Sequence, residues 1–226
     1  MLYTRQNAME NIRNRDGKRV FYLGKGDQLT SDARDWLSRE RIPVLPAQKK
    51  ESYQLLGGGT VTEKPEHMTH LNNQLLVSKT HPRIAFRGAI DLLEAQLLLC
   101  QSMADELFYG KLQQALDLTR QLIRWDVLEE PAGEVTLDGM DGEQLRKRSH
   151  FPQDFYAVPH FMPAGKDDKL LLQINLARGQ ARQAELAAVH AFSDREGNPT
   201  RLDLLQALNR LSSYLYILMI EIKGKP

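Results

Sequence analysis

Apolar residues recur at helical spacing from about residue 82 to about residue 220. Ile84, Ile90, Leu93 and Leu97 are separated by six, three and four positions, and a similar pattern resumes after Gly110. This spacing places one apolar stripe along each helix, and such a stripe has to be buried against other helices. The sequence therefore predicts a mainly α fold, an antiparallel helix bundle of about five helices.

The first part of the chain follows a different pattern. Residues 20–23 and 42–45 are short apolar runs typical of strands, and a segment that begins at Thr30 has the start signals of a helix. The composition then turns polar and includes the glycine triplet 57–59, without apolar periodicity. The predicted domains are a small N-terminal α/β unit at 1–48, a linker at 49–65 and the helix bundle at 66–226.

The last two helices of the predicted bundle are expected over residues 168–192 and from Asn198 onward. Asn198 is a suitable N-cap, and Pro199 suits the first helical position. The preceding run, residues 151–165, contains three prolines that interrupt any helix. If this run is ordered, contacts other than helical hydrogen bonds must order it.

The composition excludes several classes of function. Thirty basic against twenty-nine acidic residues leave a net charge of +1, which provides no overall field for nucleic acid or a membrane surface. Cys100 is the single cysteine, so there is no intrachain disulfide framework. No apolar run approaches the roughly 20 residues of a membrane span, and the first residues lack a secretory pattern. We expect no nucleic-acid partner, no membrane span and a cytoplasmic location.

Charged residues interrupt the apolar pattern of the penultimate predicted helix. Arg178 and Arg182 are four positions apart and Glu185 follows three later, so all three lie along one stripe. Charged groups in such sequence are costly unless they are paired with each other or with a ligand. The stripe could hold a polyanion.

A second charged stripe lies on the first predicted bundle helix. Asp91 follows Arg87 by four positions and Arg83 by eight. A carboxylate facing Arg182 would orient its guanidinium, and the remaining cations would suit phosphates. A structural ion pair between Asp91 and Arg182 is an equally good interpretation. Asn209, on the last helix, can be a packing or capping residue instead of a ligand contact.

Several stretches in a fixed order resemble one enzyme family. They are residues 64–71, 77–79, 82–91, 177–185 and 205–214. In this order and spacing they are similar to the ATP:corrinoid adenosyltransferases of ethanolamine-utilization operons, and more distantly to the propanediol-utilization type. The likeness covers most of residues 64–220 and extends weakly to 27–34.

The resemblance implies transfer of the 5′-deoxyadenosyl group of ATP to cob(I)alamin, with Mg²⁺ on the phosphates. Such a reaction needs positioning and charge neutralisation more than a general base. By this resemblance Asp91 and Arg182 pair across a subunit interface beside the nucleotide, and Arg178 and Glu185 complete that wall. The relatives are helix bundles that assemble as homotrimers, or in some cases dimers, with sites between subunits.

The resemblance also assigns binding residues. Those expected to contact ATP are Thr69, His70, Lys79 and Asn209. Arg83 and Arg87 are expected to bind its phosphates because of their charge and spacing. Phe161 matches the segment that carries an apolar side chain beneath the corrin ring, where it displaces the lower axial ligand of cobalamin. Phe161 can also be an ordinary loop aromatic that covers the core, and Phe86 is a weaker candidate for the same role.

The chain departs from the family in one respect. The ethanolamine-type relatives often carry a histidine and a cysteine cluster, a ligand set for a transition metal, just before the stretch at 64–71. Residues 47–63 contain neither cysteine nor histidine. His67 and His70 are three positions apart but lack an evident third ligand, so no protein-bound metal is predicted.

The resemblance leaves a second function open. A non-catalytic corrinoid carrier, or a bundle that docks in a bacterial microcompartment, would have a similar sequence, although a decayed site should lose its buried charges first. For the enzyme, a corrinoid reductase and ethanolamine ammonia-lyase are the expected protein partners. The interior of a microcompartment is the alternative to a free cytoplasmic location.

Overall fold

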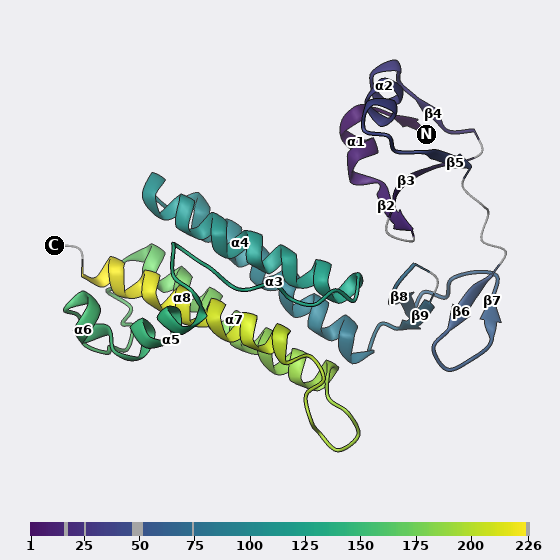
Figure 1. Ribbon diagram of the computed structural model, residues 1–226. Coiled ribbons are helices and arrows are strands. Elements are labelled where there is room, and N and C mark those ends of the chain that lie inside the picture. The colour runs from purple at the N-terminus through teal and green to yellow at the C-terminus, as the bar shows by residue number, and fades with distance from the viewer. Residues whose placement is uncertain (16–17, 25, 47–51, 74, 225–226) are drawn as a thin grey trace. The chain divides into compact units, whose positions relative to one another are not determined.

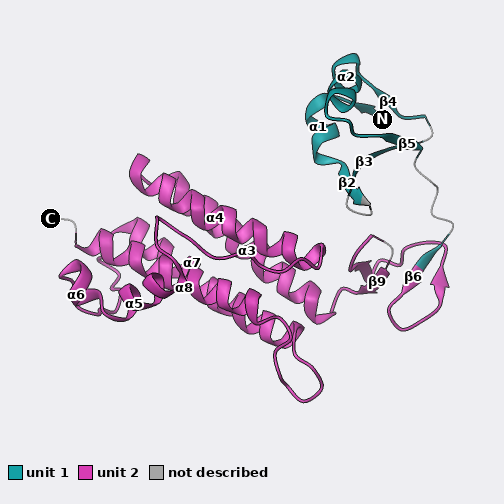
Figure 2. Ribbon diagram, viewed as in Figure 1, with its two compact units in different colours: residues 1–53 teal, residues 54–226 magenta. Residues whose placement is uncertain are grey.

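The computed structural model describes residues 1–226 except 16–17, 25, 47–51, 74 and 225–226. It divides into two compact units, Met1–Tyr53 and Gln54–Pro226 (Figure 2). The predicted domain limits stay a prediction, and residues 47–51, which contain the expected start of the linker, lie outside the described residues. Among the described residues, no helix is both long and apolar enough to cross a lipid bilayer.

The first unit is a small α/β structure, as the sequence predicts. Its elements are β1 (Leu2–Tyr3), α1 (Arg5–Glu10), β2 (Ile12–Arg15), β3 (Lys18–Leu23), β4 (Gln28–Leu29), α2 (Ser31–Arg39) and β5 (Val44–Pro46). The strands β3 and β5 are parallel, with Phe21 opposite Val44, and β2 pairs with β3 in the antiparallel sense. The β-α-β order expected for β3, α2 and β5 is therefore confirmed.

The helix α2 forms because its first turn is capped and one of its faces is apolar. The hydroxyl of Thr30 accepts a hydrogen bond from the backbone N–H of Ala33 at 3.2 Å, which satisfies one free donor of the first turn. Trp36 and Leu37 are buried and pack in one cluster with Phe21. This unit therefore has an apolar core of its own.

The second unit is a helix bundle, which confirms the predicted fold class (Figure 1). Its helices are α3 (Pro82–Met103), α4 (Glu106–Val127), α5 (Gly142–His150), α6 (Pro152–Tyr156), α7 (Lys169–Ala191) and α8 (Leu202–Lys223). The helices α3 and α4 are joined by two residues only, so they pack as a hairpin. The helix α7 packs against both α3 and α8, and these three helices supply most of the core.

Capping residues set where the long helices begin. The first helical residue of α3 is Pro82, and α7 begins after Asp168, whose carboxylate accepts from the N–H of Leu170. The prediction that α8 begins near Asn198 is wrong, because α8 starts at Leu202. Asn198 instead belongs to a turn, in which its N–H donates to the carboxylate of Asp194 at 2.8 Å.

A four-stranded sheet precedes the bundle. Its order is β7-β6-β9-β8, with β6 (Tyr53–Leu55), β7 (Thr60–Val61), β8 (Met68–His70) and β9 (Leu75–Ser78). The strands β8 and β9 form an antiparallel hairpin, in which Thr69 lies opposite Val77. Part of the segment predicted as a linker thus forms β6 and β7, because Gly58 and Gly59, at φ of 94° and 86°, allow the chain to turn between them.

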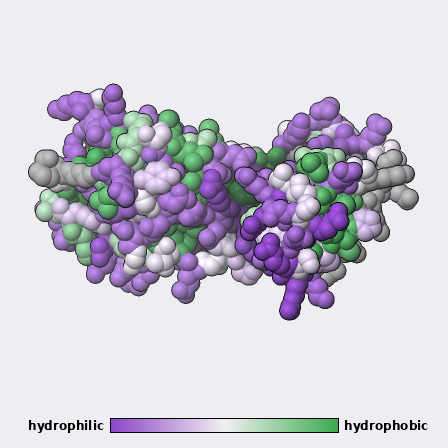
Figure 3. All heavy atoms as spheres, turned by 90° about the horizontal axis from the view of Figure 1, so that it is seen from above, coloured by the Kyte–Doolittle hydropathy of each residue, from purple (hydrophilic) through white to green (hydrophobic). Residues whose placement is uncertain are grey.

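Some apolar side chains of the bundle remain at its surface. On α3, Leu92 is 58% exposed and Leu99 is 47% exposed, and on α7, Leu186 is 62% exposed. Figure 3 shows that apolar side chains reach the surface, among hydrophilic ones, on the face that it draws. Exposed apolar side chains on two packed helices are suited to contact with another protein surface.

We expect the bundle to fold without the first unit. Its core cluster consists of residues from Phe86 to Met219, whereas the core of the first unit runs from Ala8 to Ile42. A chain of residues 54–226 should therefore keep its helical circular dichroism and one cooperative thermal transition. Loss of the cooperative transition in the shortened chain would contradict this expectation.

Candidate functional site

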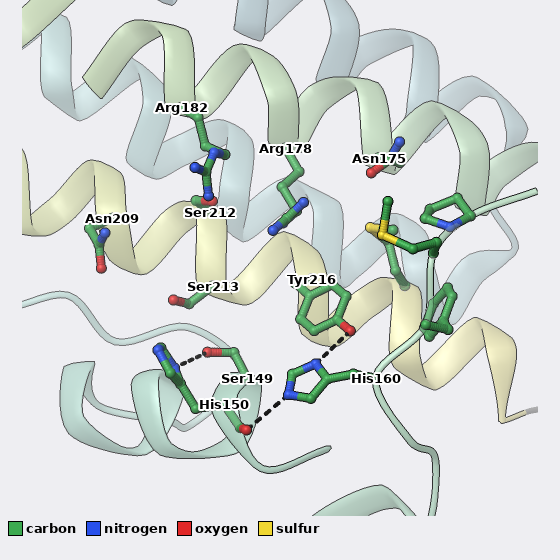
Figure 4. Close-up of a pocket in the computed structure, with 14 residues that line it drawn as sticks. Ser149, His150, His160, Asn175, Arg178, Arg182, Asn209, Ser212, Ser213 and Tyr216 are labelled. Carbon is green, nitrogen blue, oxygen red and sulfur yellow. Dashed lines mark hydrogen bonds between the residues drawn. The ribbon is translucent and has the colours of Figure 1, made fainter. Parts of the chain in front are cut away.

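A pocket of about 730 Å³ lies between α5, α7, α8 and the segment around His160 (Figure 4). Four of the residues that the sequence predicts for the site line it, namely Phe161, Arg178, Arg182 and Asn209. In Figure 4 the side chains of Arg178 and Arg182 extend from α7 toward α8. The structure thus gathers side chains from a loop and from three helices around one cavity.

The two arginines of the pocket have no counter-ion within the described part of the chain. Arg178 is half-buried and lies over the ring of Tyr216, with its Cζ 5.1 Å from the ring centroid. Desolvation and then the charge of Arg182 lower the pKa of Arg178. Two adjacent guanidiniums without a carboxylate are suited to a phosphate or another polyanion.

Glu185 and Asn209 interact at the edge of this pocket. The amide of Asn209 donates to the carboxylate of Glu185 at 3.3 Å, and its oxygen accepts from Arg210 at 2.8 Å. Asn209 lies inside α8 rather than at its end, so it does not cap this helix. Its amide can still turn toward a ligand, because the side chain is exposed.

The loop that carries Phe161 is held by aromatic contacts. Phe161 stacks on Tyr216 with ring centroids 6.0 Å apart. The neighbouring His160 lies 3.0 Å from the hydroxyl of Tyr216 through Nδ1 and 3.0 Å from the carbonyl of His150 through Nε2. Part of the proline-rich run at 151–165 forms the short helix α6, and these contacts order the segment around His160 that follows it.

Several residues of the pocket were not predicted from the sequence. They are Ser149, His150, His160, Met162, Pro163, Asn175, Ser212, Ser213, Tyr216 and Met219. The position of Tyr216 could have been found, because it follows Asn209 by seven positions and so lies on the same face of α8. His150 and His160 gave no comparable signal, since irregular backbone brings them together.

The other predicted nucleotide residues form a separate group at the start of α3. Thr69 and His70 lie on β8 and Lys79 follows β9. The backbone N–H of Lys79 donates to the carbonyl of His67 at 2.9 Å, which extends the pairing of β8 and β9 at the open end of their hairpin. None of this group lines the pocket that contains Arg178.

Arg83 and Arg87 bind a carboxylate that was not predicted from the sequence, that of Asp126. Asp126, near the end of α4, is fully buried. Its two oxygens accept from Nε of Arg83 at 2.8 Å and from Nε of Arg87 at 2.6 Å. Its backbone carbonyl accepts a further bond from Arg83 at 2.7 Å. The predicted contact of both arginines with ATP stays a prediction, and the structure adds protein partners for each.

Arg87 also reaches the hairpin. Its Nη2 donates to the carbonyl of Leu71 at 2.8 Å, and its Nη1 donates to the carbonyl of His70 at 3.3 Å. Arg83 has an outer partner in Glu129, at 3.1 Å. A signal for Asp126 existed, because a lone acidic residue in the apolar run that ends α4 requires a cationic partner.

Asp91 lies in neither group. It is exposed on α3, and no hydrogen bond or ion pair joins its carboxylate to the side chain of another described residue. Leu92, beside it, is one of the exposed apolar residues of α3. Its predicted pairing with Arg182 across an interface stays a prediction.

The described residues contain no group of three or more histidine, cysteine, aspartate or glutamate side chains that could hold a metal ion. Cys100 is buried in the core of the bundle, and burial raises the pKa of its thiol to about 11. A thiol with a raised pKa is a poor nucleophile and a poor metal ligand at neutral pH.

Comparison with known proteins shows which family has this arrangement. The family model for cobalamin adenosyltransferase matches residues 60–222. The chain belongs to the cobalamin adenosyltransferase family, as the resemblance of its motifs implies. It is 33% identical to the corrinoid adenosyltransferase EutT of Escherichia coli K12 over 160 residues, which are 71% of this chain and 60% of that protein.

A second relative is the corrinoid adenosyltransferase EutT of Salmonella typhimurium LT2, which is 32% identical over 160 residues, with the same coverage of 71% and 60%. The chain thus spans about 60% of the length of the relatives that it matches.

Two solved structures are similar in fold. Both are variants of a PduO-type adenosyltransferase from Lactobacillus reuteri, one complexed with ATP and the other with cobalamin and ATP. The first has a TM-score of 0.52 at 19% identity and covers 71% of this chain and 93% of that chain. The second has a TM-score of 0.50 at 19% identity and covers 78% and 92%. At this identity the likeness establishes the fold alone.

His81, the N-cap of α3, makes the folded state sensitive to acid. Its Nδ1 accepts a bond from the backbone N–H of Arg83 at 3.2 Å. Desolvation, then the charges of Arg83 and Arg87, lower the pKa of His81, and Asp126 partly opposes them. As the pH falls through about 6.5, His81 binds a proton in the unfolded chain before it does so in the folded chain. Stability that is present above this pH is therefore lost below it.

We expect the free energy of unfolding to decrease between about pH 7.5 and about pH 5.5, and His81→Asn to remove part of that decrease, because asparagine can cap the helix without titrating. Urea denaturation at the two pH values measures the effect. An equal pH dependence in the variant and the wild type would contradict this role of His81.

Proposed function

We propose that this chain transfers the 5′-deoxyadenosyl group of ATP to cob(I)alamin and so forms adenosylcobalamin. The observation that carries the proposal is a pair of arginines, Arg178 and Arg182, that have no counter-ion among the described residues and lie in the pocket of a cobalamin adenosyltransferase fold. In this reaction the electron pair of cobalt(I) forms a bond to C5′ of the ribose. The C5′–O bond breaks, and the polyphosphate leaves with its electron pair.

The arginines have the charge that this leaving group requires. As the C5′–O bond breaks, the oxygen that joined C5′ to the α-phosphate gains negative charge. Fixed cations stabilise that charge. Arg178 and Arg182 would supply them, together with Mg²⁺ bound to the phosphates. Glu185 would hold Asn209 toward the nucleotide. No side chain needs to act as a general base, because no proton is transferred.

We assign the corrin ring to the part of the pocket lined by Phe161, Met162 and Pro163. Phe161 lies at its edge, stacked on Tyr216, and the adjacent Met162 is 89% exposed. A large, flat, apolar ring could cover these side chains, which would otherwise face water. We assign Phe161 to the lower face of the ring, where it would keep cobalt free of an axial ligand and so easier to reduce.

Two copies of the chain would complete the site. Thr69, His70 and Lys79 do not line the pocket with Arg178, so one chain would offer its hairpin and another its pocket. The exposed apolar residues on α3 and α7 flank Asp91 and Arg182, and their burial would favour such an assembly. The assembly would be a homotrimer or a homodimer, with Asp91 of one copy facing Arg182 of the next.

Ethanolamine catabolism is the process that we propose for the product, in the cytoplasm or inside a microcompartment. The EutT relatives support this assignment. A corrinoid reductase would supply cob(I)alamin, and ethanolamine ammonia-lyase would consume adenosylcobalamin. A carrier that binds corrinoid without turnover is the alternative, and the same assay separates the two.

The assay is formation of adenosylcobalamin from ATP and chemically reduced cob(I)alamin, followed spectrally without oxygen and with Mg²⁺ as the only added metal. Arg182→Ala and Asp91→Asn should each lower turnover by about a hundredfold or more, the size expected when a charge that stabilises the transition state is removed. Arg124→Ala is a matched control, because Arg124 pairs with Glu130 at the exposed end of α4.

Corrinoid binding without turnover in the wild-type chain would indicate a carrier. If the wild type is active and both site variants equal it, the assignment of Asp91 and Arg182 is wrong.

A further inference from the structure

Asp126 is a buried charge to which the proposed reaction gives no role. Its carboxylate has no exposed surface, and Arg83 and Arg87 each donate to one of its oxygens. A buried carboxylate and its partners must be desolvated, and apolar residues of similar size would often stabilise a core equally well. A charge kept in such a core is suited to hold polar groups that an apolar residue could not hold.

Arg87 connects Asp126 to the β8–β9 hairpin. Nε of Arg87 is held by Asp126, while its two terminal nitrogens donate to the carbonyls of His70 and Leu71. The guanidinium is planar, so an acceptor at Nε also fixes the directions in which the terminal nitrogens point. Asp126 thus sets, through Arg87, where the end of β8 lies relative to α3.

We propose that Asp126 is a positioning residue for ATP, acting through Arg87 to hold the hairpin that presents Thr69, His70 and Lys79 to the nucleotide. The inference rests on the proposed function, because ATP is the substrate that the hairpin would serve. Since Asp126 has no exposed surface, it cannot touch a substrate. An effect of its replacement on ATP is therefore indirect, and Arg87 is the residue that connects Asp126 to the hairpin.

Three variants separate positioning from general stabilisation. Asp126→Asn keeps the shape of the side chain but presents an NH₂ group to one of the guanidiniums, so that a donor faces a donor. Arg87→Lys keeps the positive charge but cannot reach both hairpin carbonyls. Glu129→Gln is the control, because it changes the other carboxylate beside Arg83, which is 63% exposed.

The KM values for ATP and for cob(I)alamin are measured in steady-state assays of the full chain. Amide hydrogen exchange is measured on the same samples. Asp126→Asn and Arg87→Lys should raise the KM for ATP by about tenfold, the size of one lost charge-assisted hydrogen bond. The KM for cob(I)alamin should stay within about twofold, because the corrin side is untouched. Exchange of the Leu71 amide, which donates to Leu75, should become faster, whereas the amides of α7 should not change.

The outcomes distinguish this inference from the proposed function. If the variants have the wild-type KM for ATP and the wild-type exchange rates of the hairpin amides, Asp126 is a structural residue only. The same conclusion holds if the KM values for both substrates rise together and the amides of the helices also exchange faster. If the wild type forms no adenosylcobalamin but binds ATP, the Kd for ATP replaces the KM and must rise in the same variants. If the wild type does not bind ATP, the inference is wrong.

Discussion

The carboxylate of Asp126, which has no exposed surface, joins three parts of the second unit. It accepts from Arg83 and Arg87 of α3, it belongs to α4, and through Arg87 it anchors the β8–β9 hairpin. Removing one member of a buried ion pair costs about 3–5 kcal/mol, because the remaining charges are left without a partner. The position of the hairpin therefore depends on this carboxylate rather than on apolar packing alone.

The two arginine pairs of the bundle have opposite surroundings, and this contrast gives them different roles. Arg83 and Arg87 have their charge neutralised by Asp126, so they are suited to hold protein groups in place. Arg178 and Arg182 have no carboxylate within the described residues, and burial and mutual repulsion lower the pKa of Arg178. A site that keeps cations unpaired is prepared for an anion, and in this family fold we assign that anion to ATP.

The bundle could be predicted from the sequence because the apolar spacing of α3, α7 and α8 is regular, and the grouping of Arg178 with Arg182 follows from helical geometry. What the sequence did not reveal depends on contacts between distant segments. Asp126 lies 39 positions after Arg87, and His160 meets Tyr216 across 56 positions. Spacing along one helix carries no information on such pairs. The predicted start of α8 at Asn198 was wrong for a related reason. Asn198 belongs to a turn in which its N–H donates to the carboxylate of Asp194.

Subunit complementation tests the central claim, that the hairpin of one copy and the arginine pocket of another form one site. Lys79→Ala would disable the hairpin side and Arg182→Ala the pocket side, and each should be nearly inactive alone. When the two are co-folded, mixed assemblies should regain adenosylcobalamin formation, since one interface in each would combine an intact hairpin with an intact pocket. If mixed assemblies form and remain as inactive as the separate variants, the site lies within a single chain and the account is wrong.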